Sequence, residues 1–218
     1  MLGSSALKAG LRKYLGSIVD CINSNKSSAG RFLHKMNSYA SIYEELLFKY
    51  VGQEVALAEI GIGYGGCLQM WREYLGDKSS IFGIDSGDRL LYEEPQIKCF
   101  LADQSQPETI ESVAKQLPEL DIFIDDAGHF SHQQISTFNI MFSKLKRGGL
   151  YFCEDTHTSY RELYEGGYKK SGTFIEFCKD LTDVLNCTEY PYVEFSSSAR
   201  AIHSVSFYAS LVVIRKVL

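Results

Sequence analysis

The sequence lacks long apolar runs, paired cysteine motifs and a basic excess, and each absence excludes a class of protein. No stretch of about 18 apolar residues marks a membrane span, and no apolar leader run marks a secretory signal. The six cysteines stand apart without a C-x-x-C pair, which favours reduced thiols and a cytoplasmic protein. The net charge of -5 argues against nucleic acid as the main partner, because phosphate binding needs a concentrated basic face.

The length and the distribution of charge indicate one main domain preceded by a basic arm. A chain of 218 residues fits a single ordinary domain, and we expect a helical arm or cap over residues 1–50 and the main domain over residues 51–218. Residues 1–36 carry six basic side chains and one acidic side chain. This pattern favours an arm that packs on an acidic body over one that binds an anionic membrane. The arm could also cover a pocket or join protomers of a homo-oligomer.

The middle of the chain alternates strand-like and helix-like patterns. Short apolar runs at residues 55–60, 80–84, 97–101, 120–124 and 150–153 are typical of buried parallel strands. Helical spacing of apolar residues predicts helices at residues 11–22, 41–50, 68–75, 110–117, 135–145 and 174–185. The β-rich runs at residues 192–195 and 204–214 have no helix between them. We therefore predict an α/β doubly wound sheet that ends in an antiparallel hairpin.

A glycine-rich turn follows the first predicted strand. Gly61, Gly63 and Gly66 satisfy the G-x-G-x-x-G pattern, which permits a tight turn and close approach of a ligand to the backbone. The pattern by itself is also compatible with close helix packing. Asp85 ends the second strand, where a carboxylate can accept both ribose hydroxyls, and Asp103 ends the third, where it could accept an adenine amino group or cap a turn. Acids at successive strand ends fit a nucleoside without phosphates, so S-adenosylmethionine is favoured over NAD.

Two further strand ends carry acidic clusters. Asp126 follows the fourth run, and Glu154 and Asp155 follow the fifth. Because the carboxyl ends of adjacent parallel strands share a crevice, these three carboxylates could converge on one hard cation, with His129 beside it. Metal-assisted proton removal from a hydroxyl is the chemistry that this set favours.

The histidines allow a second interpretation of the same segment. A zinc site formed by His129, His132 and His157 is less attractive, since no cysteine lies near them at ligand spacing and the carboxylates would have no role. For His132 and His157 individually we favour a structural role.

These residues also carry a family resemblance. The segments 59–66, 83–85, 103–105, 124–126 with His129 and 132–133, 154–160, 173–177 and 207–208 resemble the class I S-adenosylmethionine-dependent methyltransferases related to macrolide-sugar O-methyltransferases and the cephalosporin-hydroxylase group. The resemblance covers roughly residues 42–216. It implies a seven-stranded Rossmann-like sheet, bound Mg²⁺ and methylation of a sugar hydroxyl in a glycoside, natural product or polysaccharide precursor.

The resemblance assigns roles to individual residues. It implies that Asp126, Glu154 and Asp155 bind the metal ion and that His129 is the general base. The residues implied to contact S-adenosylmethionine are Glu59, Gly61, Gly63, Tyr64, Gly65, Asp85, Asp103, Gln104 and Asp126. The tyrosine-rich segment 160–168 could close over the substrate, or could equally form a surface loop or a subunit contact.

Two other functions remain open at the level of sequence. An NAD(P)-dependent oxidoreductase would use the same glycine turn and Asp85. A non-catalytic scaffold would keep the Rossmann-like fold without turnover, because a fold alone does not guarantee activity.

Overall fold

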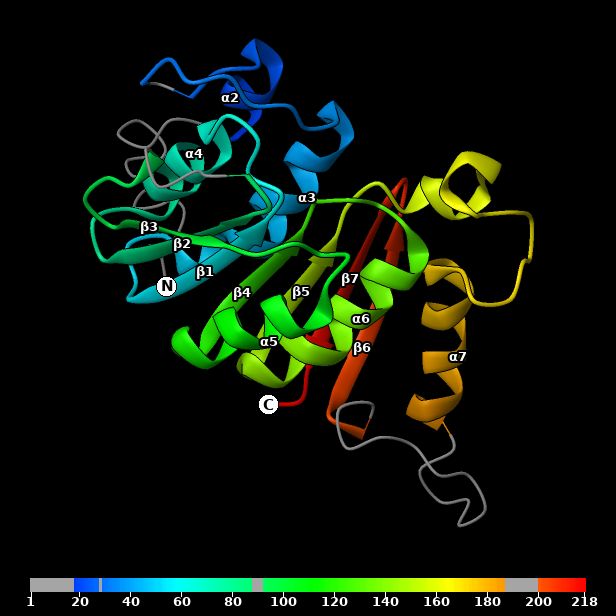
Figure 1. Cartoon of the computed structure of the whole chain (residues 1–218). Helices are drawn as coiled ribbons and strands as arrows, with labels where there is room; N and C mark the ends of the chain where they lie inside the picture. The colour runs from blue at the N-terminus through cyan, green and yellow to red at the C-terminus, as the bar shows by residue number, and fades with distance from the viewer. Residues whose placement is uncertain (1–17, 28, 88–91, 187–199) are drawn as a thin grey trace.

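The computed structural model describes residues 18–27, 29–87, 92–186 and 200–218. Within them lies one seven-stranded sheet of order β3-β2-β1-β4-β5-β7-β6 (Figure 1). The strands are β1 (Val55–Ile60), β2 (Ser79–Asp85), β3 (Ile97–Leu101), β4 (Leu120–Asp125), β5 (Leu145–Cys153), β6 (Ile202–Tyr208) and β7 (Leu211–Lys216). Strands β1 to β5 pair in parallel, and β7 pairs antiparallel with β5 and β6. The predicted doubly wound, Rossmann-like sheet with a C-terminal antiparallel hairpin is confirmed.

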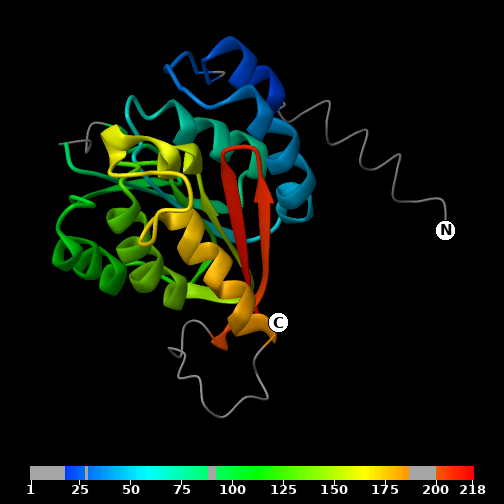
Figure 2. The same cartoon turned by 90° about the vertical axis from the view of Figure 1, so that its right-hand side faces the viewer.

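Helices cover both faces of this sheet. They are α2 (Ile18–Ser24), α3 (Asn37–Leu47), α4 (Gly66–Leu75), α5 (Pro107–Gln116), α6 (Ser131–Met141) and α7 (Phe174–Asn186), with 3-10 turns η1 (Phe48–Tyr50), η3 (Phe142–Lys144), η4 (Thr156–Tyr160) and η5 (Glu162–Tyr164). One apolar core packs α5, α6 and α7 against the sheet, and a second core packs α2, α3 and α4 against the opposite face. Figure 2 shows the β6–β7 hairpin between α3 and α7.

The strands predicted at 55–60 and 97–101 have the bounds of β1 and β3. The predicted run at 80–84 is one residue shorter than β2 at each end, and the run at 120–124 is one residue shorter than β4. The run at 150–153 covers only the second part of β5, which begins at Leu145. The prediction for the end of the chain was wrong in detail. The apolar run at residues 204–214 is itself the hairpin, because the chain turns between β6 and β7, where Ser210 has a φ of 61°. The predicted strand at residues 192–195 lies outside the described residues, as does most of the predicted helix at 11–22.

The first strand is buried along its whole length, and so is the polar residue that it carries. All six residues of β1 are buried, and Glu59 has no exposed surface. Helix α3 packs in the same core as β1 through Tyr39, Tyr43 and Leu47. The division of the chain at residue 50 stays a prediction. In the described residues no helix is both long and apolar enough to span a membrane.

Strand register decides what meets at the carboxyl edge of the sheet. Ile60 of β1 is aligned with Asp125 of β4, which is aligned with Cys153 of β5. Just beyond the strands, the Asp126 N–H donates to Ile60 O at 2.9 Å, and the Glu154 N–H donates to Asp125 O at 2.9 Å. The glycine turn and both acidic strand ends therefore lie side by side.

Candidate active site

The glycine turn between β1 and α4 is held to β2 by one carboxylate. Gly61, Gly63 and Gly65 have φ values of 90°, 48° and 76°, which lie in the left-handed region that favours glycine. Asp85 Oδ2 accepts hydrogen bonds from the backbone N–H groups of Ile62 and Gly63 at 3.1 and 3.2 Å. Asp85 thus fixes the shape of the turn as well as lining the cavity beside it.

A cavity of about 490 Å³ opens over this turn. Its size falls within the range of small-molecule sites. It is lined by six of the nine residues predicted to contact the cofactor: Gly61, Gly63, Asp85, Asp103, Gln104 and Asp126. The other three are not part of its lining: Glu59 is buried, Tyr64 is 65% exposed and Gly65 is the N-cap of α4. Three predicted strand-end aspartates, Asp85, Asp103 and Asp126, therefore meet the glycine turn in one cavity.

Gln104 and Asp125 form a buried network under this cavity. Gln104 Nε2 donates to Asp125 Oδ1 at 2.7 Å, and Gln104 Oε1 accepts the Gly128 N–H at 2.8 Å. The Tyr151 hydroxyl donates to Asp125 Oδ2 at 3.0 Å. Burial raises the pKa of Asp125 to about 7, against the lowering effect of these hydrogen bonds. Asp125 therefore faces the core, and Asp126 alone of the Asp-Asp pair faces the cavity.

The predicted metal ligands fall into two groups that share Asp126. In the described residues, single ligand atoms of Asp126, His129 and Asp155 lie within 4.8 Å of one another, and so do those of Glu59, Asp126 and Glu154. The structure brings Asp126 to both Asp155 and Glu154, but it does not place Glu154 and Asp155 in one group. The two adjacent residues diverge: Glu154 is 1% exposed, whereas Asp155 has a left-handed φ of 52° and a partly exposed carboxylate.

Lys35, which the sequence analysis assigned only to the basic arm, is buried among Glu59, Asp126 and Glu154. Lys35 Nζ lies 2.8 Å from Glu59 Oε1, 3.1 Å from Asp126 Oδ2 and 2.5 Å from Glu154 Oε1. Burial alone would lower the pKa of Lys35, but the three carboxylates raise it well above its usual value. The lysine therefore carries a positive charge inside the acidic cluster.

The cluster holds three carboxyl groups around one ammonium group. Burial and the nearby Glu154 carboxylate raise the pKa of Asp126 well above its usual range, against the effect of Lys35. Burial also raises the pKa of Glu154, with Lys35 opposing and Glu59 adding to the rise. Converging carboxylates of this kind are the ligand set that a hard divalent cation prefers. The donor set therefore fits a magnesium ion.

His129 belongs to the ligand group that it forms with Asp126 and Asp155. Its Nε2 is 3.5 Å from Asp155 Oδ2, and its Nδ1 is buried without a hydrogen-bond partner. Burial lowers the pKa of His129, although Asp155 opposes this effect. The backbone has a φ of 59° and its carbonyl accepts a hydrogen bond from Thr158 Oγ1 at 2.9 Å. The ring is thus held at Asp155 with one nitrogen unpaired.

His132 and His157 do not complete a histidine metal site. His132 is 63% exposed, and its Nδ1 lies 3.5 Å from Glu165. His157 Nδ1 lies 4.0 Å from Asp155 Oδ1, and neither residue belongs to the ligand groups found in the described chain. Carboxylates, with one histidine, form the clusters instead.

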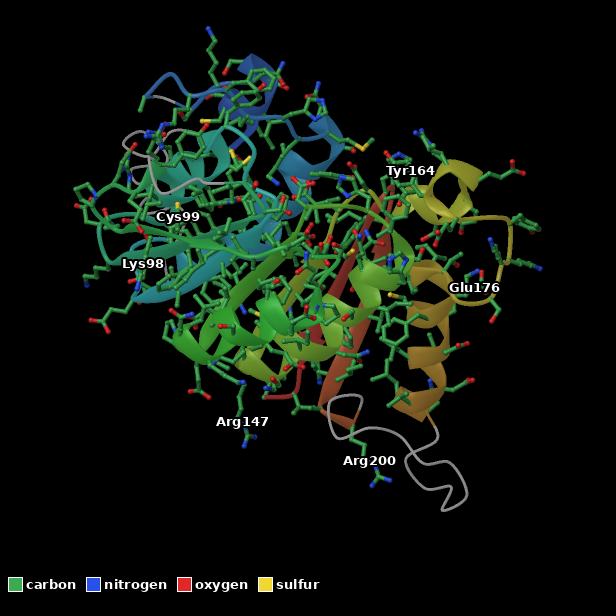
Figure 3. All side chains as sticks on the ribbon, in the orientation of Figure 1. Lys98, Cys99, Arg147, Tyr164, Glu176 and Arg200 are labelled. Carbon is green, nitrogen blue, oxygen red and sulfur yellow. The ribbon has the colours of Figure 1, made fainter. Side chains whose placement is uncertain are left out.

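A second cavity, of about 520 Å³, lies on the other side of Asp126. Its walls come from the segment before α3 and from the segments that follow β4 and β5: His34, Lys35, Met36, Asp126, His129, Glu154, Asp155, His157, Thr158, Arg161 and Tyr164. In Figure 3, Tyr164 lies near the carboxyl ends of the central strands β4 and β5, whereas Lys98 and Cys99 lie on the edge strand β3. Asp126 and His129 therefore stand between a cavity at the glycine turn and a polar cavity that can hold a second molecule.

Sequence analysis missed the residues that the α3 region contributes. The Tyr39 hydroxyl lies 2.8 Å from Asp155 Oδ1 and accepts the Asp155 N–H at 3.1 Å, while the Tyr43 hydroxyl donates to Glu154 Oε1 at 2.5 Å. Tyr39 and Tyr43 are one helical turn apart, so a shared face was readable from sequence. Nothing in the local pattern indicated that this face would meet the acidic strand ends.

Comparison with known proteins supports the observed fold. No family model matches the chain. A Streptomyces olivaceus protein, 8-demethyl-8-alpha-L-rhamnosyl tetracenomycin-C 2'-O-methyltransferase, is 31% identical over 83% of this chain and 50% of its own length. The structure of the MycE methyltransferase from the mycinamycin biosynthetic pathway, in complex with Mg and SAH, matches 93% of this chain and 55% of that chain, with a TM-score of 0.83 and 25% identity. The chain belongs to the class I S-adenosylmethionine-dependent methyltransferases.

Further proteins named as methyltransferases are similar to this chain. Mycinamicin VI 2''-O-methyltransferase of Micromonospora griseorubida is 30% identical over 73% of this chain and 42% of its own length. A second MycE structure, in complex with Mg, SAH and mycinamycin VI, matches 99% of this chain and 57% of that chain with a TM-score of 0.83 and 26% identity. The chain spans about half the length of the curated relatives that it matches. The family membership predicted from the strand-end motifs is confirmed.

Proposed function

We propose that this protein is a Mg²⁺-dependent O-methyltransferase that transfers the methyl group of S-adenosylmethionine to a sugar hydroxyl. The observation that carries the proposal is the position of Asp126, which lines both the cavity at the glycine turn and the polar cavity next to it. A methyl donor in the first cavity and an acceptor in the second would meet beside Asp126 and His129. The relatives named as sugar O-methyltransferases support this arrangement.

The first cavity fits a nucleoside donor. We assign the ribose hydroxyls to Asp85 and the adenine edge to the side of Asp103 and Gln104, as the strand-end positions predicted. Asp103 Oδ1 also accepts hydrogen bonds from the Ser105 N–H and hydroxyl at 2.8 and 2.7 Å, so it caps its own turn while lining the cavity. Bound S-adenosylmethionine supplies an activated methyl group on a sulfonium centre.

The second cavity fits a metal ion and a hydroxylated acceptor. We assign Asp126, Glu154 and Asp155 as metal ligands, with Asp126 and Asp155 already grouped in the structure. The fit is supported by the convergence of the Glu59, Asp126 and Glu154 carboxyl groups on a position where the chain supplies one ammonium group. Bound Mg²⁺ would stabilise the negative charge that develops on the acceptor oxygen, an effect worth several kcal/mol.

His129 is the residue that we assign to proton removal. Its imidazole lines the acceptor cavity and is oriented by Asp155. It takes the hydroxyl proton while the oxygen forms a bond to the methyl carbon; the carbon–sulfur bond breaks and its electron pair stays on sulfur. A positioned base of this kind typically contributes about 10²- to 10⁴-fold in rate.

The lining of the acceptor cavity supports a polar, hydroxylated substrate. Arg161 and Tyr164, from the segment after β5, add hydrogen-bonding groups opposite the carboxylates. Tyr164 also contacts the Phe130 ring at 5.4 Å between centroids, which supports a role for this segment as a wall over the acceptor. We further propose a cytoplasmic location, supported by the five described cysteines, which are buried thiols.

Calorimetry with the purified protein tests the donor. S-adenosylmethionine and S-adenosylhomocysteine should bind, and NAD should not. Tight binding of NAD without either adenosyl compound would reverse the assignment in favour of an oxidoreductase. Binding of no small molecule would favour a scaffold.

Methyl transfer from radiolabelled S-adenosylmethionine to a panel of glycosides tests the reaction. Transfer should require divalent metal and stop on chelation by EDTA. Full activity in EDTA would remove the metal from the mechanism while leaving the methyl donor in place.

A further inference from the structure

The acidic cluster already contains a cation that belongs to the chain. The Lys35 side chain has no exposed surface, and its ammonium group contacts one oxygen from each of Glu59, Asp126 and Glu154. A buried lysine is rare unless it is paired with opposite charge. With three carboxylate oxygens within 3.1 Å of Lys35 Nζ, this position is a preformed binding site for a cation.

The walls of the site hold both the lysine and its partners. The rings of Trp71 and Tyr43 lie 5.7 and 5.9 Å from Lys35 Nζ, within the range of cation–π attraction. Trp71 Nε1 donates to Glu59 Oε2 at 2.9 Å, and the Tyr43 hydroxyl donates to the same Glu154 oxygen that Lys35 contacts. Glu154 is therefore held toward the core from two sides.

The N-terminal segment that carries Lys35 is itself tightly seated. A Cβ atom on Gly66 would come within 2.3 Å of Phe32 O, so only glycine lets this segment cross the start of α4. Arg31 Nη2 lies 2.7 Å from Glu94 Oε1. Lys35 thus reaches the cluster from a backbone that is anchored on the α4 side of the sheet.

The position of Lys35 has a direct consequence for the ligand set. Glu154 groups with Glu59 and Asp126 around the ammonium, while Asp155 groups with Asp126 and His129. An ion bound by all three assigned ligands requires Glu154 to approach Asp155. That approach takes Glu154 away from Lys35.

We propose that Lys35 is a positioning residue that competes with the metal ion for Glu154, so that binding of the ion by Asp126, Glu154 and Asp155 displaces the Lys35–Glu154 contact. This inference rests on the proposed metal function. Because like charges repel and the two cations share carboxylates, removing the ammonium should strengthen metal binding. Loss of a purely structural lysine would instead loosen the carboxylates and weaken it.

The test compares Mn²⁺ affinity in wild type and Lys35→Met by electron paramagnetic resonance of free Mn²⁺, with folding checked by thermal unfolding. We expect at least about tenfold tighter binding in the variant, since the charge removed lies within contact distance of two assigned ligands. Lys98→Met is the matched control. Like Lys35, Lys98 lies against an aromatic ring, with its Nζ 4.9 Å from the Phe100 centroid. It is exposed on β3 and is not part of the acidic cluster (Figure 3). The control should bind Mn²⁺ as wild type does.

The outcomes separate this inference from the proposed function. If wild type binds Mn²⁺ and Lys35→Met binds it equally or more weakly, the competition is overturned while the metal function stands. If neither protein binds Mn²⁺, both fail.

Wild-type crystals give a second measurement should Lys35→Met not fold. In metal-free and Mn²⁺-soaked crystals we expect Lys35 to leave Glu154 as the ion takes its place. An ion on Glu154 with the lysine contact retained, or an ion bound without Glu154, would overturn the inference.

Discussion

Gly61 lies directly against the backbone of Asp126. A Cβ atom built on Gly61 would come within 2.0 Å of the Asp126 carbonyl oxygen, and the Asp126 N–H donates to the neighbouring Ile60 carbonyl at 2.9 Å. The turn that lines the donor cavity and the strand end that carries the central carboxylate are therefore packed backbone to backbone. The glycine at this position is required by the protein itself as well as by the close approach of a ligand.

Substitution Gly61→Ala should damage both stability and cofactor binding. The left-handed φ of 90° alone costs on the order of 1–3 kcal/mol for a residue with a side chain, and the clash with Asp126 adds to it. Urea unfolding measures the loss. Gly52→Ala is the matched control, with a φ of 74° and no atom within 4 Å of its Cβ, and should lose less. Equal losses in the two variants would show that the Asp126 contact is unimportant.

Substitution His129→Ala should remove turnover and leave the donor site intact. We expect kcat to fall by about 10²- to 10⁴-fold, the usual contribution of a positioned base, with S-adenosylhomocysteine affinity unchanged. Single-turnover transfer and calorimetry measure the two quantities. His203→Ala, on the exposed side of β6, provides the control. A variant of His129 that keeps wild-type turnover would remove the base assignment.

Substitution Asp85→Asn should weaken binding of the methyl donor without affecting the metal. Asp85 Oδ2 accepts from the Ile62 and Gly63 N–H groups, and Oδ1 accepts from the Gly87 N–H. An asparagine amide has one acceptor oxygen, so it cannot keep these bonds and also accept the ribose hydroxyls. We expect at least about tenfold weaker binding of S-adenosylhomocysteine, corresponding to 1.4 kcal/mol or more. Calorimetry gives the affinity, and the exposed Asp77→Asn is the control. Unchanged affinity at position 85 would argue against a ribose partner there.

In the Glu94→Gln variant, the free energy of unfolding should vary less with pH in the acid range. Glu94 Oε2 accepts from Arg72 at 2.6 Å, and Oε1 accepts from Gln69 at 2.6 Å and pairs with Arg31. Burial alone would raise the pKa of Glu94, but the hydrogen bonds from Arg72 and Gln69 and the charge of Arg31 together lower it. A carboxylate whose pKa is lowered on folding stabilises the protein above its unfolded pKa, near 4.3, and loses that contribution as the pH falls through the folded value.

At pH 7 the glutamine variant should therefore be less stable by about 1 kcal/mol, a value kept small because the Glu94 side chain is 22% exposed. The difference should shrink below about pH 4 as wild-type Glu94 becomes protonated. Urea unfolding across this range provides the measurement. A difference that stays constant with pH would mean that the carboxylate charge is not what anchors residues 31–36.

Much of the architecture could be predicted because buried strands appear in the sequence as short, mostly apolar runs. The runs that became β1 and β3 are continuous and apolar, and the helices between strands end at clear signals such as Gly76 after α4. The hairpin was harder, since its two strands form one apolar run and the turn at Ser210 has no glycine. Strand-end acids could likewise be found, because register alone brings Asp126 next to Glu154.

The parts of the site that could not be predicted depend on contacts distant in sequence. The charge of the segment that carries Lys35 predicted an arm packed on an acidic body, but not which carboxylates it would meet. Two of them lie 91 and 119 residues away in sequence. The direction of Glu154 was equally hidden, because the left-handed backbone at Asp155 turns two adjacent carboxylates apart. Gly66 fitted a cofactor motif, but the structure gives it a packing role against Phe32.

The central claim is that Asp126 joins a metal ion to the methyl-transfer site, and Mn²⁺ binding to wild type and Asp126→Asn tests it most directly. Asp126 belongs to both ligand groups, so its loss should affect an ion in either position. Electron paramagnetic resonance of free Mn²⁺ should show one bound ion in wild type and at least about tenfold weaker binding in the variant, with S-adenosylhomocysteine binding retained. Equal Mn²⁺ affinity in the two proteins would contradict the account.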